Sequence, residues 1–290
     1  MSQHVVIKLI GTAQDGGIPQ ANCGCVNCQR AYNEPAAGQR NAASLAIILP
    51  DEGKWYMIDA TPNFGQQIHS VRDCYPNLGT MTGILLTHAH IGHYTGLMFL
   101  GREAMSTRNM SIYAGERMQV ILRDHVPWKQ LVDIGNIELQ GLEDKLPFNL
   151  EKKLSIKPVL VPHRNEYSET FGFVVSGLHK KVFYLPDIDN WDPWEDFEEI
   201  ISSVDYSFLD GTFFSKEEIA QKGRDYREIP HPPIPETMDL LQKIVARKNA
   251  NIYFTHLNHT NPAADPNSEA AATIKSRGFF VADEGMEIEI

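Results

Sequence analysis

The stretch GILLTHAHIGHYTGLMFL, residues 83–100, decides the fold, because it places three histidines where a strand gives way to a helix. The apolar run that stops at Thr87 predicts a buried strand. The segment YTGLMFLGREAM, residues 94–105, predicts a helix directly after the turn. The junction between them therefore presents its polar side chains from two rigid elements.

The three histidines of this junction have the spacing of metal ligands. Residues two apart in an extended segment point the same way, so His88 and His90 can bind one ion. His93 follows just past the turn and can approach the ion from another side. Neutral imidazoles aimed in this way predict a catalytic metal site with an open position. Three unrelated histidines in a surface loop are the alternative.

The rest of the chain predicts two sheets covered by helices. Short runs rich in Val, Ile, Phe and Tyr predict strands, bounded by turn residues. These runs lie at residues 4–11, 44–50, 54–60, 83–90, 111–114, 154–163, 171–177, 181–187, 205–211, 251–259 and 279–285. Helical patterns lie at residues 63–74, 235–249 and 266–278. Without a Pro/Gly/Ser-rich linker, this order predicts one mixed α/β (α+β) domain over residues 1–290.

Composition narrows the class of partner. The formal net charge of −11 disfavours nucleic acid and anionic membrane surfaces, which bind clustered lysine and arginine. The apolar runs are too short to span a bilayer, and the first residues lack the pattern of a signal peptide. We therefore expect a cytoplasmic protein with reduced thiols and a small-molecule substrate. A homodimer stays open.

Three of the four cysteines lie within ANCGCVNCQRA, residues 21–31. In a reducing compartment, Cys23, Cys25 and Cys28 predict a metal site that needs one further ligand. A redox pair and inert thiols are the alternatives. Cys74 stands alone and is predicted to be a small buried side chain.

The order strand, H-x-H-x-x-H, helix resembles the metallo-β-lactamase superfamily, and further marks of that superfamily follow in order. Asp59 resembles its first motif, an acid that organises the histidine loop. His163 and His256 resemble the third and fifth motifs, and Asp187 resembles the fourth, a carboxylate that bridges two metals. The resemblance implies a single-domain αββα sandwich with the metals at one edge between the sheets. Each residue taken alone fits a turn or a structural histidine equally well.

One position departs from the superfamily pattern, which usually reads H-x-H-x-D-H. Gly92 stands where that aspartate is expected, so we predict a well-formed first metal site and a weakened second one, with one tightly bound Zn, Mn or Fe ion. Asp15 and Asp189 are candidate substitutes. The resemblance assigns His88, His90, His163 and Asp187 to the first site, and His93, His256 and the shared Asp187 to the second.

The cysteine segment narrows the resemblance further. The stretch GTAQDGGIPQANCGCVNCQRA, residues 11–31, is similar to the pyrroloquinoline quinone (PQQ) biosynthesis protein B family, and THLNHTNPAADPNSEAA, residues 255–271, agrees. It is more loosely similar to phosphonate-pathway cyclic phosphodiesterases. In their pattern, the histidine three residues after the fifth motif completes a structural zinc site with the cysteines, and here that residue is His259.

These resemblances imply a metal-dependent hydrolase in which a metal-activated water attacks a small ester or phosphodiester-type substrate. His93, Asp187 and His256 are the catalytic candidates, and no cofactor besides the metals is expected. His231 and Asp210 are candidates for the pocket wall, although a solvent-facing His231 fits equally well. A metal-dependent oxygenase and a cofactor carrier in PQQ biosynthesis are the alternatives.

Overall fold

The computed structural model describes residues 4–192, 194–220, 229–248 and 250–290. Its strands form two seven-stranded sheets. The first has the order β14-β1-β2-β3-β4-β5-β6 and the second the order β13-β12-β11-β10-β9-β8-β7. Strands of the first sheet are β1 (Val6–Gly11), β2 (Ser44–Leu49), β3 (Lys54–Ile58), β4 (Gly83–Leu85), β5 (Met110–Ala114), β6 (Ile137–Gly141) and β14 (Glu287–Glu289). Strands of the second are β7 (Phe148–Glu151), β8 (Leu154–Leu160), β9 (Phe171–Ser176), β10 (Lys181–Leu185), β11 (Tyr206–Asp210), β12 (Asn251–Thr255) and β13 (Phe280–Val281).

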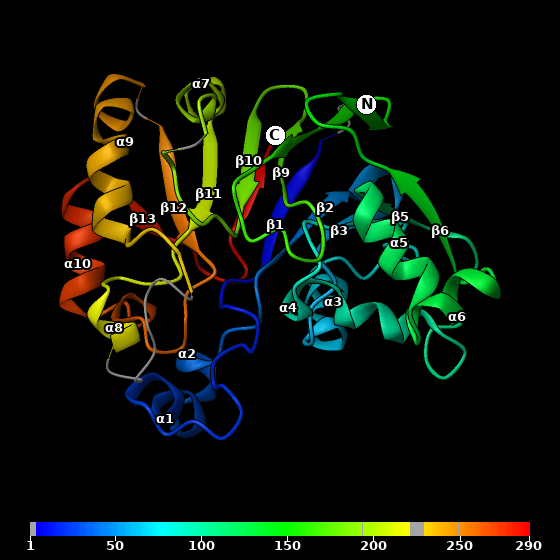
Figure 1. Ribbon diagram of the computed structural model, residues 1–290, viewed down its shortest axis with the longest axis horizontal. Coiled ribbons are helices and arrows are strands. Elements are labelled where there is room, and N and C mark those ends of the chain that lie inside the picture. Colours follow the sequence, from blue (N-terminus) through cyan, green and yellow to red (C-terminus); the bar gives the residue numbers. More distant parts are fainter. Residues whose placement is uncertain (1–3, 193, 221–228, 249) are drawn as a thin grey trace.

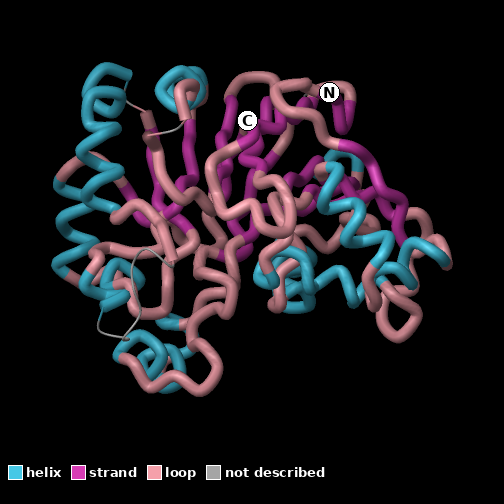
Figure 2. Tube along the Cα trace, in the orientation of Figure 1, coloured by secondary structure: helices cyan, strands magenta, loops and turns pink. Residues whose placement is uncertain are grey.

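Helices cover the outer face of each sheet, as Figures 1 and 2 show. They are α1 (Val26–Asn33), α2 (Pro35–Gly38), α3 (Phe64–Cys74), α4 (Ile91–Tyr94), α5 (Glu116–Asp124), α6 (Trp128–Asp133), α7 (Phe197–Ser203), α8 (Glu217–Ala220), α9 (Ile234–Lys248) and α10 (Glu269–Ser276). In Figure 1, α9 and α10 flank the second sheet, while α5 and α6 flank the first. The predicted αββα sandwich is confirmed.

The alternation of side chains along the strands explains the four layers. In β3, Trp55 packs toward the helices of the first sheet, whereas the next residue, Tyr56, packs into the cluster between the sheets. In β12, Phe254 packs against the helices of the second sheet and Tyr253 faces the first sheet. Because central strands are buried on both faces, they are continuous apolar runs in the sequence.

The two sheets are built alike at the edge that matters for function. Strands β3, β4, β5 and β6 pair in parallel, and so do β10, β11, β12 and β13. Parallel strands end at the same edge of a sheet, so residues just after β3, β4, β10, β11 and β12 are brought together. Loops at the carboxyl ends of parallel strands are where such sheets bind ligands.

Three of the predicted helices are present, with small changes at their ends. The helix predicted at residues 63–74 is α3, and that predicted at residues 266–278 is the shorter α10. Ser268 caps α10 by accepting a hydrogen bond from Ala271 N at 3.1 Å. The helix predicted at residues 235–249 is α9, and Asn249 lies outside the described residues.

The helix predicted at residues 94–105 is wrong. The chain forms the short α4 and then a 3₁₀ helix over Thr95–Leu100. Gly96 donates to the carbonyl oxygen of Ala60 at 2.8 Å, and a Cβ at this position would collide with the loop after β3. This close approach of two backbones replaces regular α-helical packing.

The prediction for Cys74 is also wrong, because this cysteine is exposed. The buried face of α3 consists of Phe64, Gln67 and Val71, and the helix ends at Cys74. No helix among the described residues is both long and apolar enough to cross a membrane.

Candidate metal centres

The first donor group consists of His88, His90 and His163, whose ring nitrogens lie within 4.8 Å of one another. His163 Nε2 lies 3.1 Å from His90 Nδ1. Asp187 stands beside them, with Oδ2 3.5 Å from His88 Nε2 and Oδ1 3.8 Å from His163 Nε2. The structure thus brings together the four residues that the sequence assigned to the first site.

The second donor group consists of Asp15, His93, Asp187 and His256. Asp187 Oδ2 lies 3.0 Å from His93 Nε2 and 3.4 Å from His256 Nε2. Asp15 Oδ1 lies 3.2 Å and 3.5 Å from the same two nitrogens. Asp187 therefore belongs to the second group and borders the first.

These separations suit a shared cation. Two ligands at about 2.1 Å from a tetrahedral zinc lie about 3.4 Å apart. The Nε2 atoms of His88, His93 and His256 are buried, and within the described residues they make no hydrogen bond. Buried nitrogens without a partner are costly, and a metal ion would satisfy them.

Asp59 supports both groups from behind. Its Oδ2 lies 2.8 Å from His93 Nδ1, and its Oδ1 accepts a hydrogen bond from Thr87 N at 2.8 Å. Thr87 Oγ1 in turn lies 2.9 Å from His88 Nδ1. Asp59 has φ +64, a left-handed conformation that is strained for an aspartate. This arrangement directs the Nε2 atoms of both histidines toward the candidate metal positions.

The histidines from the second sheet have outer partners as well. His256 follows β12 with φ +60, and its Nδ1 lies 2.9 Å from Thr212 Oγ1. His163 Nδ1 lies 2.7 Å from Asp189 Oδ1. Asp189 is thus a neighbour of the first group and does not belong to the second, although it had been a candidate substitute there.

The charges of His88, His90 and Asp187 suit metal binding. Burial lowers the pKa of His88 well below its ordinary value, and it lowers the pKa of His90 to about 4. Both imidazoles are therefore neutral at pH 7, the form that binds metals. Burial alone would raise the pKa of Asp187, but the surrounding histidines outweigh it and hold this pKa well below its usual range.

His231 and Asp210 lie inside the site, so the solvent-facing alternative for His231 is wrong. Both are buried, and His231 Nδ1 lies 2.7 Å from Asp210 Oδ2 and 3.6 Å from Asp187 Oδ1. Asp210 also accepts hydrogen bonds from Ile188 N at 3.0 Å and Thr212 N at 2.8 Å. Burial opposes protonation of His231, but Asp210 outweighs it and raises the pKa to about 9.

The cysteine site consists of Cys23, Cys25, Cys28 and His259. The three sulfurs lie 3.2, 3.4 and 3.6 Å from His259 Nδ1. Three sulfurs and one imidazole are a complete tetrahedral set for zinc, which leaves no position for a substrate. Burial raises the pKa of the Cys28 thiol to about 12, so a bound cation would have to stabilise the thiolate.

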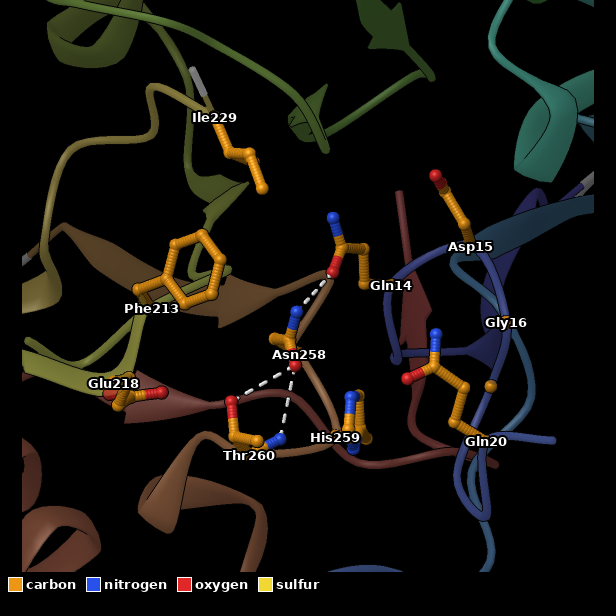
Figure 3. Close-up of a pocket in the computed structure, with 11 residues that line it drawn as sticks. Gln14, Asp15, Gly16, Gln20, Phe213, Glu218, Ile229, Asn258, His259 and Thr260 are labelled. Carbon is orange, nitrogen blue, oxygen red and sulfur yellow. Dashed lines mark hydrogen bonds between the residues drawn. The ribbon is translucent and has the colours of Figure 1, made fainter. Parts of the chain in front are cut away.

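Two cavities adjoin the site, and Asp15 lines both. The first, of about 440 Å³, has amide and hydroxyl groups on its floor, where Asn258 donates to Gln14 and accepts from Thr260 (Figure 3). Phe213 and Ile229 lie on the opposite side of this cavity from Asp15 (Figure 3).

The second cavity, of about 590 Å³, reaches His90 of the first donor group. Its walls include the aromatic side chains of Tyr94, Trp128 and Tyr167 and the guanidinium group of Arg164. Trp128 Nε1 and Arg164 Nε are buried, and they make no hydrogen bond to any described residue. Two buried polar atoms that make no hydrogen bond within the described residues thus belong to side chains that line this cavity.

A family model described as the beta-lactamase superfamily domain matches residues 54–257, and this range includes all six residues predicted as active-site ligands. This chain belongs to the β-lactamase superfamily. The superfamily predicted from the histidine motif is therefore confirmed.

This superfamily member resembles coenzyme PQQ synthesis protein B over nearly its whole length. It is 28% identical to that protein of Methylococcus capsulatus, over 98% of this chain and 99% of the relative. It is 26% identical to the protein of Methylobacillus flagellatus, over 97% of this chain and 99% of the relative.

Solved structures show the same fold. The Zn²⁺-bound PqqB from Methylobacterium extorquens aligns with a TM-score of 0.83 at 22% identity, over 98% of this chain and all of that one. A diphosphatase from the PhnP family aligns with a TM-score of 0.71 at 21% identity, over all of this chain and 98% of that one. The structure of the first neighbour contains bound Zn²⁺.

Several residues of the site escaped sequence reasoning. Thr87 and Thr212 orient histidines, but single threonines beside a strand end carry no signal of their own. Arg164 directly follows His163 in the sequence, and this adjacency was the available hint that a positively charged side chain lines the second cavity. Trp128 comes from α6, far from any motif, and nothing in the sequence connects it with the site.

Proposed function

We propose that this superfamily member is a metal-dependent hydrolase of a small ester or phosphodiester-type substrate. The observation that carries the proposal is that Asp187 lies between the two donor groups, with Oδ2 3.5 Å from His88 Nε2 and 3.0 Å from His93 Nε2. The groups adjoin two cavities through His90 and Asp15. A divalent cation bound there lowers the pKa of its water toward about 7 and polarises a substrate oxygen.

The roles of the residues follow from their placement. His88, His90 and His163 would hold one cation, and Asp187 would bridge to the second donor group. His93 and His256 complete that group, where their Nε2 atoms lie beside Asp187 Oδ2. Asp59 would keep the ring of His93 oriented during turnover, and Thr212 would do the same for the ring of His256.

The cavities support a substrate with an acceptor group beside an apolar part. Arg164 and Trp128 line the second cavity and would favour a carboxyl or phosphoryl oxygen. The rings of Tyr94 and Trp128, whose centroids lie 4.7 Å apart, suit an apolar portion. The acidic chain disfavours nucleic acid as this substrate.

The test is hydrolysis of 4-nitrophenyl carboxylic esters and of bis(4-nitrophenyl) phosphate by protein reloaded separately with Zn, Mn and Fe. We expect one class to be hydrolysed, and His163→Ala to abolish the reaction. His69→Ala is the matched control, because His69 is exposed on α3. A fully metal-loaded protein inactive on both classes contradicts the proposal.

A role in PQQ biosynthesis, as a metal-dependent oxygenase or a cofactor carrier, is the second candidate. It is favoured by the similarity to coenzyme PQQ synthesis protein B over 98% of the chain. A site rich in histidine and carboxylate also suits iron and oxygen chemistry. Oxygen uptake by the iron-loaded protein with a quinone precursor, together with failure to hydrolyse either ester class, would favour this candidate.

We also propose a cytoplasmic location, because three clustered thiols bind metal only where they stay reduced. Cell fractionation followed by thiol alkylation tests this. We expect the protein in the cytosolic fraction, and recovery outside the cell with these cysteines oxidised contradicts it.

A further inference from the structure

The position beside His93 has no room for the acid that the superfamily pattern places there. A Cβ on Gly92 would lie 2.5 Å from Asp15 Cα and closer still to the carboxylate of Asp15. Real Cβ atoms do not approach other atoms so closely, and one of these atoms belongs to the backbone. The space that a side chain at position 92 would occupy is therefore filled by Asp15.

Asp15 presents one oxygen to the second donor group and keeps the rest of its side chain accessible. Its Oδ1 is buried and makes no hydrogen bond within the described residues, although 42% of the side-chain surface is exposed. That oxygen lies 3.2 Å from His93 Nε2 and 3.5 Å from His256 Nε2, and neither nitrogen makes a hydrogen bond within the described residues. Three buried polar atoms thus converge where a cation would satisfy all of them.

The backbone fixes Asp15 in this place. Gln14 N donates to Leu257 O at 2.9 Å, and Leu257 N donates to Thr12 O at 2.9 Å, so the chain before Asp15 pairs with the chain after His256. The Gln14 side chain accepts a further hydrogen bond from Asn258. Two ligands of the second donor group, distant in sequence, are therefore held in register by one short ladder.

We propose that Asp15, carried by the glycine-rich loop of residues 12–25, supplies the carboxylate that completes a second site for a divalent Zn, Mn or Fe ion. The inference rests on the proposed function in one respect, namely that the two donor groups bind metal. It replaces the expectation of a weakened second site, because two histidines and two carboxylates are a full set for a divalent cation.

The test is the metal content and zinc affinity of the full-length protein. We expect three zinc ions per wild-type chain: two in the donor groups and one in the cysteine site. Asp15→Asn should lose one ion, with at least a tenfold weaker second step in a cobalt titration followed by its visible spectrum. Asp73→Asn, on the exposed face of α3, is the matched control and should keep all three ions.

A second variant separates a ligand role from a general effect on folding. Gly92→Ala substitutes none of the proposed ligand residues, yet its methyl group must displace the Asp15 side chain. This variant should therefore lose the same ion while its circular dichroism spectrum stays unchanged. The inference is overturned if Asp15→Asn binds the second active-site ion as tightly as the wild type does. It is also overturned if the wild-type chain holds only one ion outside the cysteine site. Two ions in the donor groups without any hydrolysis would instead contradict the proposed function and leave the inference standing.

Discussion

The cysteine site and the histidine–aspartate site are built on opposite principles. Three of the four ligands of the cysteine site lie within residues 23–28, and its donor set is complete. The ligands of the histidine–aspartate site come from helix α4 and from loops that follow strands of both sheets, and two cavities adjoin the site. A site closed by protein ligands stabilises a loop, whereas a site open to a cavity can admit a substrate.

The two sites are nevertheless connected through the glycine-rich loop. Asp15 lies on this loop ahead of the cysteines, and His259 follows His256 by three residues. The cysteine site thus fastens the two segments that carry Asp15 and His256. We therefore expect the cysteine site to position part of the histidine–aspartate site, and the following variants test that relation.

The largest effect is expected from Asp187→Ala, because Asp187 is a member of the second donor group and borders the first. Its loss leaves the clustered histidines without their shared carboxylate, so both active-site ions should bind more than about 100-fold more weakly. The ion of the cysteine site should remain. Elemental analysis and zinc titration measure this, and retention of both active-site ions would show that the groups do not share a ligand.

Cys28→Ser should act on both sites, but unequally. The cysteine site loses its ion, and the released loop should weaken the second donor group about tenfold while sparing the first. Hydrogen exchange of residues 12–28 and metal content measure this. Cys74→Ser is the matched control, since Cys74 is exposed at the end of α3. Unchanged exchange in Cys28→Ser would mean that the two sites are independent.

Asp59→Asn tests the support behind the open site alone. Asparagine tolerates the left-handed backbone at φ +64 but loses the charge that faces His93. We expect metal affinity in the donor groups to fall about 10-fold, the lower end of the range for outer partners. The cysteine site should be unaffected, and an equal loss there would point to a global change in the fold.

The smallest effect is expected from Thr212→Val, which removes one hydrogen bond to His256. A single such bond contributes about 1 kcal/mol, so affinity for the second ion should fall less than about tenfold. Thr273→Val, which removes an exposed hydroxyl from α10, serves as the control. A loss as large as that in Asp59→Asn would give this hydroxyl a greater role than its single contact indicates.

Sequence reasoning reached most of the fold because central strands buried on both faces are continuous apolar runs. It failed after His93, where the helix predicted to Met105 is a short α-helix and a 3₁₀ helix. The backbone contact of Gly96 with Ala60 decides that segment, and such a contact leaves no periodic signal. The prediction that Cys74 is buried failed for a related reason, because the exposure of this cysteine depends on where α3 ends.

The sequence by itself determined the superfamily, the histidine and cysteine sets and most of the strands, because ligand spacing and apolar periodicity are local properties of the chain. It did not predict β6, β7 or β14, nor the order of the strands within the sheets. Only the tertiary structure decided that Asp15 fills the space beside Gly92, that Asp189 stands behind His163, and that Trp128 and Arg164 line one cavity. These placements depend on the path of loops packed against distant segments. No spacing within one segment contains that information.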